Sequence, residues 1–162
     1  MPAPRRESQL KKEAFAENSQ AVQAHLSIAQ SVIQRTANNS AACKTWCVTL
    51  VSAILVIVAG EGKGNLAPLA IIPILLFFFL DTYYLALEQR FRNAYNSFID
   101  RLHERKLESA DLYAVVPQGK PMQTFFAKIL SPSIWPFYLV LVVLTLLAMF
   151  FVIGTPATAP KL

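Results

Sequence analysis

Three long apolar stretches of this chain contain no charged residue, namely 46–60, 66–80 and 134–154. The third is 21 residues long, and a helix needs about 20 consecutive apolar residues to cross the hydrocarbon core of a bilayer. Only 15% of the whole chain is charged, whereas an ordinary soluble domain has about 25%. The pattern excludes a disordered chain, a disulfide scaffold and a typical cytosolic enzyme. It predicts an all-α integral membrane protein with three transmembrane helices and a long cytoplasmic helical hairpin.

Proline and glycine residues mark where the predicted helices begin, bend or end. Gly62 and Gly64 favour a tight turn that returns the chain antiparallel. Pro68 suits the first turn of a helix, and Pro73 is expected to kink the second span. The predicted transmembrane helices are residues 45–60, 66–86 and 134–154, with 61–65 forming an external turn.

Two further segments are predicted to be cytoplasmic helices, 15–44 and 87–108. In each of them apolar or small residues recur at steps of three and four, a spacing typical of a coiled-coil seam. We expect the seams to pair the two helices or to join copies of the chain in an oligomer. The seam residues are Val22, Leu26, Ala29 and Ile33 in the first helix, and Tyr84, Leu87, Phe91 and Phe98 along the second.

The remaining segments are shorter. Residues 122–131 place Met122, Phe125 and Phe126 close to Lys128, which predicts an amphipathic helix lying on the inner membrane surface. The other segments are predicted to be a disordered basic N-terminus at 1–14, a loop at 109–121 and an external tail at 155–162.

The distribution of basic residues predicts the orientation. Residues 1–44 hold six Lys or Arg and residues 88–131 hold seven, against Lys63 in the predicted turn and Lys161 in the tail. Because basic residues accumulate on the cytoplasmic side of membrane proteins, the N-terminus is expected inside and the C-terminus outside. Topology therefore accounts for the net charge of +5, and we expect no nucleic-acid partner.

Polar residues at the edge of the spans are the candidate functional residues. Asn38, Asn39 and Ser40 precede the first span, and they either pack at the headgroup boundary or line a wet vestibule in an oligomer. Asp81 ends the apolar part of the second span, and an ionisable residue there is a functional candidate. It has either a gating role or a structural one, in which it caps the third span near Trp135 or pairs with a basic residue. The candidate charge partners are Arg35 and Lys44.

The sequence offers no recognisable catalytic set. It has no Ser/His/Asp arrangement, no paired carboxylates and no glycine-rich phosphate loop opening a helix. His25 and His103 are expected to pack between helices or to contact solvent. Cys43 and Cys47 lack the further ligands that a metal site needs. We therefore expect a non-enzymatic protein with no catalytic residue, no metal and no cofactor.

Two stretches resemble a group of small bacterial membrane proteins. They are IQRTANNSAACKTWCVTLVSAILVI at 33–57 and LDTYYLALEQRFRNAYN at 80–96. Together with the turn between them they look like the two-span modules of the SLATT-like group, predicted effectors of bacterial antiphage systems. The resemblance implies an oligomer that permeabilises the bacterial inner membrane once a partner senses infection. The chain departs from the group by its third span and by the lack of a sensing domain, which implies a separate cytoplasmic sensor protein.

Two functions therefore stay open at the level of sequence. The first is a non-enzymatic inner-membrane effector that forms a homo-oligomer, contacts lipid and perturbs the bilayer in antiviral defence. The alternative is a membrane anchor whose cytoplasmic helices dock a soluble partner.

Overall fold

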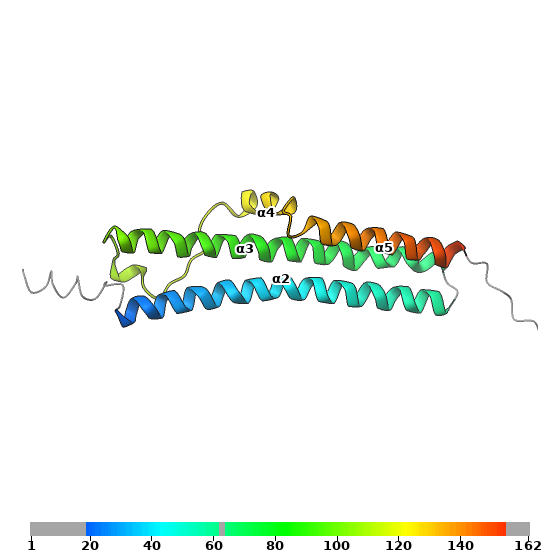
Figure 1. The fold of residues 1–162 in the computed structure, drawn as a ribbon, viewed down its shortest axis with the longest axis horizontal. Coiled ribbons are helices and arrows are strands. Elements are labelled where there is room, and N and C mark those ends of the chain that lie inside the picture. Colours follow the sequence, from blue (N-terminus) through cyan, green and yellow to red (C-terminus); the bar gives the residue numbers. More distant parts are fainter. Residues whose placement is uncertain (1–18, 62–63, 155–162) are drawn as a thin grey trace, which may run out of the picture. The chain divides into compact units, whose positions relative to one another are not determined.

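The computed structural model describes residues 19–61 and 64–154 (Figure 1). Within these two ranges the chain is helical and contains no strand, so the expected all-α class is confirmed there. The long helices are α2 (Gln20–Gly60), α3 (Ile71–His103) and α5 (Trp135–Gly154). The short elements are the 3₁₀ helices η1 (Gly64–Ala70) and η2 (Ser109–Asp111), and α4 (Pro121–Ile129).

Two helical stretches are long and apolar enough to cross a membrane, Gln20–Gly60 and Gly64–His103. That judgement rests on length and composition alone. The part of α5 from Trp135 to Phe151 is a shorter apolar helix than these two. The structure is thus compatible with the first two predicted spans, whereas the third span stays a prediction.

Several predicted boundaries differ from the observed ones. The second cytoplasmic helix was expected to reach residue 108, but α3 ends at His103 and a turn follows. The second span was expected to be α-helical from Leu66, but its first residues form η1. Pro73 consequently lies in the first turn of α3 and not in a helix interior. At this position no preceding α-helical turn supplies a hydrogen bond for proline to break, so the expected kink does not arise. The predictions for 1–14 and 155–162, and for the start of the first helix before residue 19, fall outside the described residues.

The chain forms two compact units, although its length predicts one domain. Within the described residues, unit 1 comprises 19–37 and 86–124, and unit 2 comprises 38–61, 64–85 and 125–154. Each of the helices α2 and α3 contributes one part to each unit.

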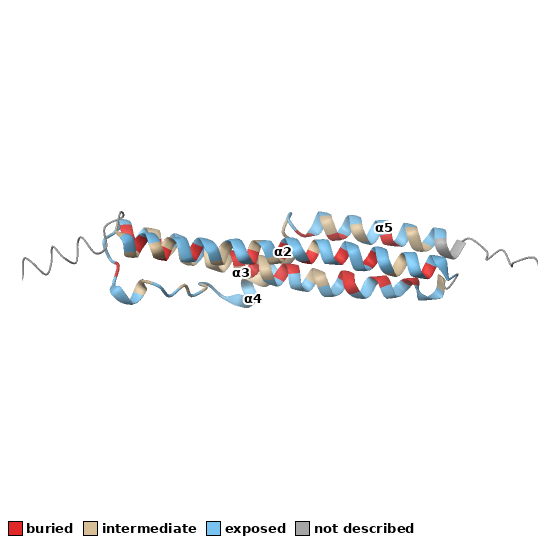
Figure 2. Cartoon of the chain, turned by 90° about the horizontal axis from the view of Figure 1, so that it is seen from below, coloured by how far each residue is buried: buried red, intermediate tan, exposed pale blue. Residues whose placement is uncertain are grey.

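The core of unit 1 joins α2, α3 and the segment that follows α3. Val22 is fully buried against Phe98 and Leu102, and Leu107 completes the cluster. Leu26 and Leu112 pack against this cluster from its edge. Figure 2 shows how buried positions recur along α2 and α3 with exposed residues between them, as expected of helices that pack along one face.

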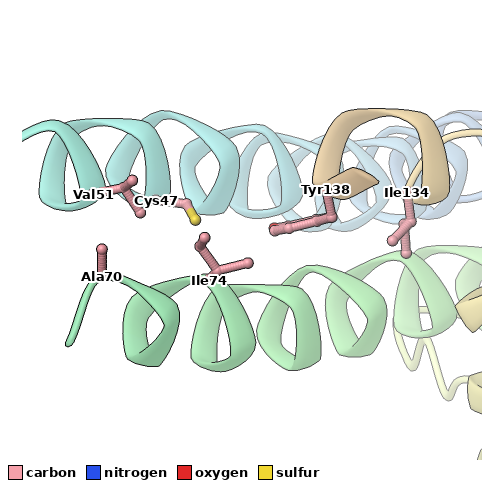
Figure 3. Close-up of a cluster of buried hydrophobic side chains, with 6 residues drawn as sticks. All are labelled: Cys47, Val51, Ala70, Ile74, Ile134 and Tyr138. Carbon is pink, nitrogen blue, oxygen red and sulfur yellow. The ribbon is translucent and has the colours of Figure 1, made fainter. Parts of the chain in front are cut away.

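The core of unit 2 is built where α2, the segment of η1 and α3, and the start of α5 with the residue before it meet (Figure 3). Its labelled side chains point toward one another from the three segments. Elsewhere on these segments large apolar side chains are exposed, for example Val56 at 71% and Phe150 at 73%. The buried members are Cys47, Val51, Ala70, Ile74, Ile134 and Tyr138.

Candidate functional site

A buried polar cluster lies among the apolar residues of unit 2, and we call it the Asp81 cluster. It consists of Asp81 on α3 with Ser40 and Lys44 on α2. The Asp81 side chain has no exposed surface, and the Lys44 side chain is 25% exposed. One carboxylate oxygen of Asp81 accepts a hydrogen bond from the Ser40 hydroxyl. The other accepts one from the Lys44 ammonium at 2.5 Å.

The helical repeat brings the two α2 residues to the same carboxylate. Ser40 and Lys44 are four residues apart, so their side chains lie on one face of α2. The Lys44 Nζ lies 3.5 Å from the Ser40 Oγ, and both groups face Asp81 across the interface with α3. Both oxygens of the buried carboxylate are therefore satisfied, as a buried charge requires.

The start of α5 adds aromatic side chains beside the Asp81 cluster. The Lys44 Nζ lies 6.0 Å from the centre of the Phe137 ring, at the outer limit of a cation–π contact. The Tyr138 hydroxyl donates a hydrogen bond to the Phe77 carbonyl at 3.0 Å, and its ring meets Phe78 edge to face at 5.4 Å. These contacts fix α5 against α3 one helical turn before Asp81.

The charges of Asp81 and Lys44 stabilise this cluster only when both are present. A buried ion pair is neutral as a whole, but removing one partner leaves a buried charge at a cost of about 3–5 kcal/mol. Part of Lys44 reaches the surface, so hydration offsets some of that cost. The cluster can hold two helices in register, and it can expose two opposite charges if the helices separate.

The candidate residues of the sequence analysis are not all in this cluster. Of the three polar residues before the first span, Ser40 is buried in the cluster, Asn39 is half-buried and Asn38 is exposed. Lys44 is the charge partner of Asp81, whereas Arg35 is exposed and belongs to unit 1. Asp81 does pair across helices, which is one of the structural roles considered for it.

The predicted seam residues divide between the two units. In unit 1, Val22, Ala29 and Phe98 are buried. The other seam residues are half-buried: Leu26, Ile33, Leu87 and Phe91 in unit 1, and Tyr84 in unit 2.

The cysteines belong to the apolar core. Cys43 and Cys47 are both free thiols and both buried. The Cys47 thiol contacts the Pro73 carbonyl at 3.8 Å. Within residues 19–61 and 64–154, no group of three or more His, Cys, Asp or Glu side chains could hold a metal ion.

His25 has a more specific environment than sequence reasoning assigned to it. Its side chain is 4% exposed, and its ring stacks on Phe98 with 4.1 Å between ring centres. The Nδ1 atom accepts a hydrogen bond from the backbone N–H of Tyr113 at 3.0 Å. Burial lowers the pKa of His25 from its usual 6.5, and the nearby Asp111 carboxylate opposes that shift. No sequence pattern signals this bond, because its donor lies 88 residues away in an irregular segment.

No protein-family model, curated protein or solved structure matches this chain.

Proposed function

We propose that this protein is a non-enzymatic effector of a bacterial inner membrane that forms a homo-oligomer and permeabilises the bilayer. Unit 2 would lie in the lipid, and unit 1 would face the cytoplasm with the N-terminus inside and the C-terminus outside. The resemblance to the SLATT-like group suggests a role in antiphage defence, in which a separate sensor protein supplies the trigger.

The apolar surface of unit 2 supports placement in a bilayer. Large apolar side chains of α3 and α5 are exposed at 50% or more of their surface, among them Leu76, Phe79, Leu144 and Phe150. In water such surfaces would drive aggregation, whereas in lipid they are the expected outer face.

The Asp81 cluster is the observation that carries the proposal. Charges within an apolar segment are costly unless they are paired or hydrated. Asp81 and Lys44 are paired inside a single chain. An assembly of several chains offers the other stable arrangement, in which the same charges face a water-filled path. The pair would therefore hold a closed state, and its separation would accompany opening.

Dye release from vesicles tests this function. Purified protein is reconstituted into vesicles of phosphatidylethanolamine and phosphatidylglycerol, and release of a small dye is followed. We expect Asp81→Asn to release dye at least about tenfold faster than the wild type, because breaking a buried pair shifts a two-state equilibrium by that much or more.

Two controls accompany this measurement. Glu88→Gln removes an acid of α3 that pairs with the exposed Arg92 four residues later, and it should leave the leakage rate unchanged. The double variant Lys44→Gln with Asp81→Asn removes both charges and should return leakage to the wild-type rate. Equal leakage from Asp81→Asn, Glu88→Gln and the wild type would contradict the proposal.

The alternative function, a membrane anchor for a soluble partner, is favoured by one feature of unit 1. That unit has its own core and a cavity lined by residues of α2, α3 and the segment after α3. Cross-linking from position 30, on the exposed side of α2, distinguishes the two functions. Self-contacts between copies support the effector, and a cross-link to a different protein with no self-contact supports the anchor.

A further inference from the structure

The segment after α3 folds back over unit 1, and we call residues 104–118 the strap. Leu107 and Leu112 on the strap pack into the core formed by Val22 and Phe98. Arg101 of α3 holds Asp111 of the strap through two hydrogen bonds of 2.7 and 2.6 Å.

The C-terminal end of the strap is hydrogen-bonded to a single residue of α3, Arg90. The backbone N–H of Gln118 donates to the Arg90 carbonyl at 3.1 Å, and the Arg90 guanidinium donates to the Pro117 carbonyl at 3.3 Å. The strap is thus tied to α3 at Asp111 and again at its C-terminal end.

The middle of the strap is tied to the other helix. The Tyr113 N–H donates to Nδ1 of His25, which projects from α2. Of the hydrogen bonds named for the strap, this is the one that joins it to α2. His25 is also held flat against Phe98, so its ring has a fixed orientation toward the strap.

The protonation state of His25 is set by this geometry. Because Nδ1 accepts a hydrogen bond, the imidazole is neutral and carries its proton on Nε2. An imidazolium carries hydrogen on both ring nitrogens, so a protonated Nδ1 would face the Tyr113 N–H with donor against donor. The bond would be lost, and a positive charge would lie in a buried site.

The charged groups around His25 leave the neutral form favoured. Asp111 on η2 attracts an imidazolium and raises the pKa, but its carboxylate is engaged by the Arg101 guanidinium of α3. Burial acts more strongly in the opposite direction and lowers the pKa of His25. At neutral pH the ring is therefore neutral and the bond to Tyr113 is intact.

The backbone at Tyr113 is strained while the strap lies over unit 1. Its φ is +65°, a left-handed conformation that is sterically unfavourable for a residue with a side chain. Once the hydrogen bond to His25 is lost, Tyr113 gains by returning to a negative φ, which moves this part of the strap away from α2.

A cavity of about 210 Å³ lies between the strap and the two helices. Alanines at positions 29, 94, 110 and 114 leave this space unfilled. His25 and Asp111 both line the cavity, so movement of the strap changes the shape of the cavity directly.

We propose that His25 is a proton-operated latch, and that its protonation releases Tyr113 and opens the strap over the unit 1 cavity. This device is independent of the proposed membrane-permeabilising function, because it depends on contacts within unit 1.

Hydrogen–deuterium exchange on the full-length protein in detergent micelles tests the latch. Exchange of a peptide that covers Leu112 to Val116 is compared between about pH 7.5 and pH 5, a range that spans an ordinary histidine titration. After correction for the intrinsic pH dependence of amide exchange, we expect opening of this peptide to increase at least about tenfold at the lower pH, because a hydrogen bond is lost and a charge is buried.

Two variants at position 25 make the test specific. His25→Asn keeps an acceptor oxygen close to the place of Nδ1 but does not titrate, whereas His25→Phe keeps the stacked ring and removes the acceptor. Both should abolish the pH dependence of strap exchange, and His25→Phe should also exchange faster at pH 7.5. His103→Asn, which removes the other histidine, should respond to pH like the wild type. Wild-type exchange that does not change with pH, or a wild-type response in His25→Asn, would overturn the proposal.

Discussion

Asp81 is a fully buried charged residue in unit 2. Its carboxylate is completely buried and binds both a hydroxyl and an ammonium of α2. A carboxamide at this place is nearly isosteric but cannot balance the Lys44 charge. The strength of the cluster thus comes from charge rather than from shape.

We predict that Asp81→Asn lowers the stability of unit 2 by about 3 kcal/mol, at the lower end of the range for buried pairs because Lys44 is partly hydrated. Thermal denaturation in detergent measures the change. The matched variant Glu88→Gln should cost less than about 0.5 kcal/mol, because its partner Arg92 is exposed. Because Glu88 is also buried, at 9% exposure, similar losses in both variants would show that hydration of the cation left behind does not matter.

His25 gives stability a defined pH dependence. Its pKa in the folded protein is below 6.5, so the unfolded chain binds the proton more tightly. The contribution of His25 to stability is therefore complete above about pH 6.5 and is lost as the pH falls through the folded pKa. We expect the melting temperature to decrease over that range in the wild type and to decrease less in His25→Asn. An identical slope in the two proteins would contradict this assignment.

The end of α3 is an element-scale feature that sequence reasoning placed five residues too late. Lys106 N–H bonds to the Arg101 carbonyl, and Arg105 N–H bonds to the Leu102 carbonyl. These two bonds form a Schellman motif, whose left-handed residue is usually glycine. Here it is Arg105, with φ of +57°. Without a glycine in the sequence, nothing marked this end.

Arg105→Gly should therefore stabilise unit 1. Glycine adopts a positive φ without a steric penalty, and we expect a gain of about 0.5–1 kcal/mol after its larger unfolded-state entropy is subtracted. Chemical denaturation measures the difference. Glu104→Gly, at a neighbouring residue whose φ is not positive, should instead destabilise. A gain in stability from both variants would show that the effect of Arg105→Gly does not come from relief of strain at position 105.

The short helix α4 has its own element-scale prediction. None of its residues is buried, and Met122, Phe126 and the following Leu130 are each exposed at 60% or more on one face. A nine-residue helix is marginal by itself, so a lipid surface is the expected support. In a background in which Trp46 and Trp135 are phenylalanine, Phe126→Trp should be quenched by brominated lipids, and Ala127→Trp should be quenched much less. Equal quenching of the two tryptophans would show that α4 does not lie on the lipid by the face that carries Phe126.

At the scale of the whole molecule, the prediction concerns the number of membrane crossings. Three spans put the two termini on opposite sides of the membrane. A periplasm-active reporter fused after Leu162 should be active in cells, and one fused before Met1 should be inactive. Activity of a cytoplasmic reporter at the C-terminal position would instead require an even number of crossings, with α5 excluded from the bilayer.

The sequence by itself determined the all-helical class and the approximate positions of the long helices in residues 19–61 and 64–154, but not the 3₁₀ helices η1 and η2. It did so because uncharged stretches and steps of three and four are local properties of a chain. It also identified Asp81, Lys44 and Ser40 as candidates, since an ionisable residue beside an apolar stretch is conspicuous.

Only the tertiary structure decided which of several possible partners each polar residue has. Asp81 binds Lys44 and Ser40, Arg35 is exposed in the other unit, and His25 accepts a bond from a backbone group 88 residues away. The physical reason is that hydrogen bonds and ion pairs depend on distances of a few ångströms between separate segments, which no periodicity along the chain specifies.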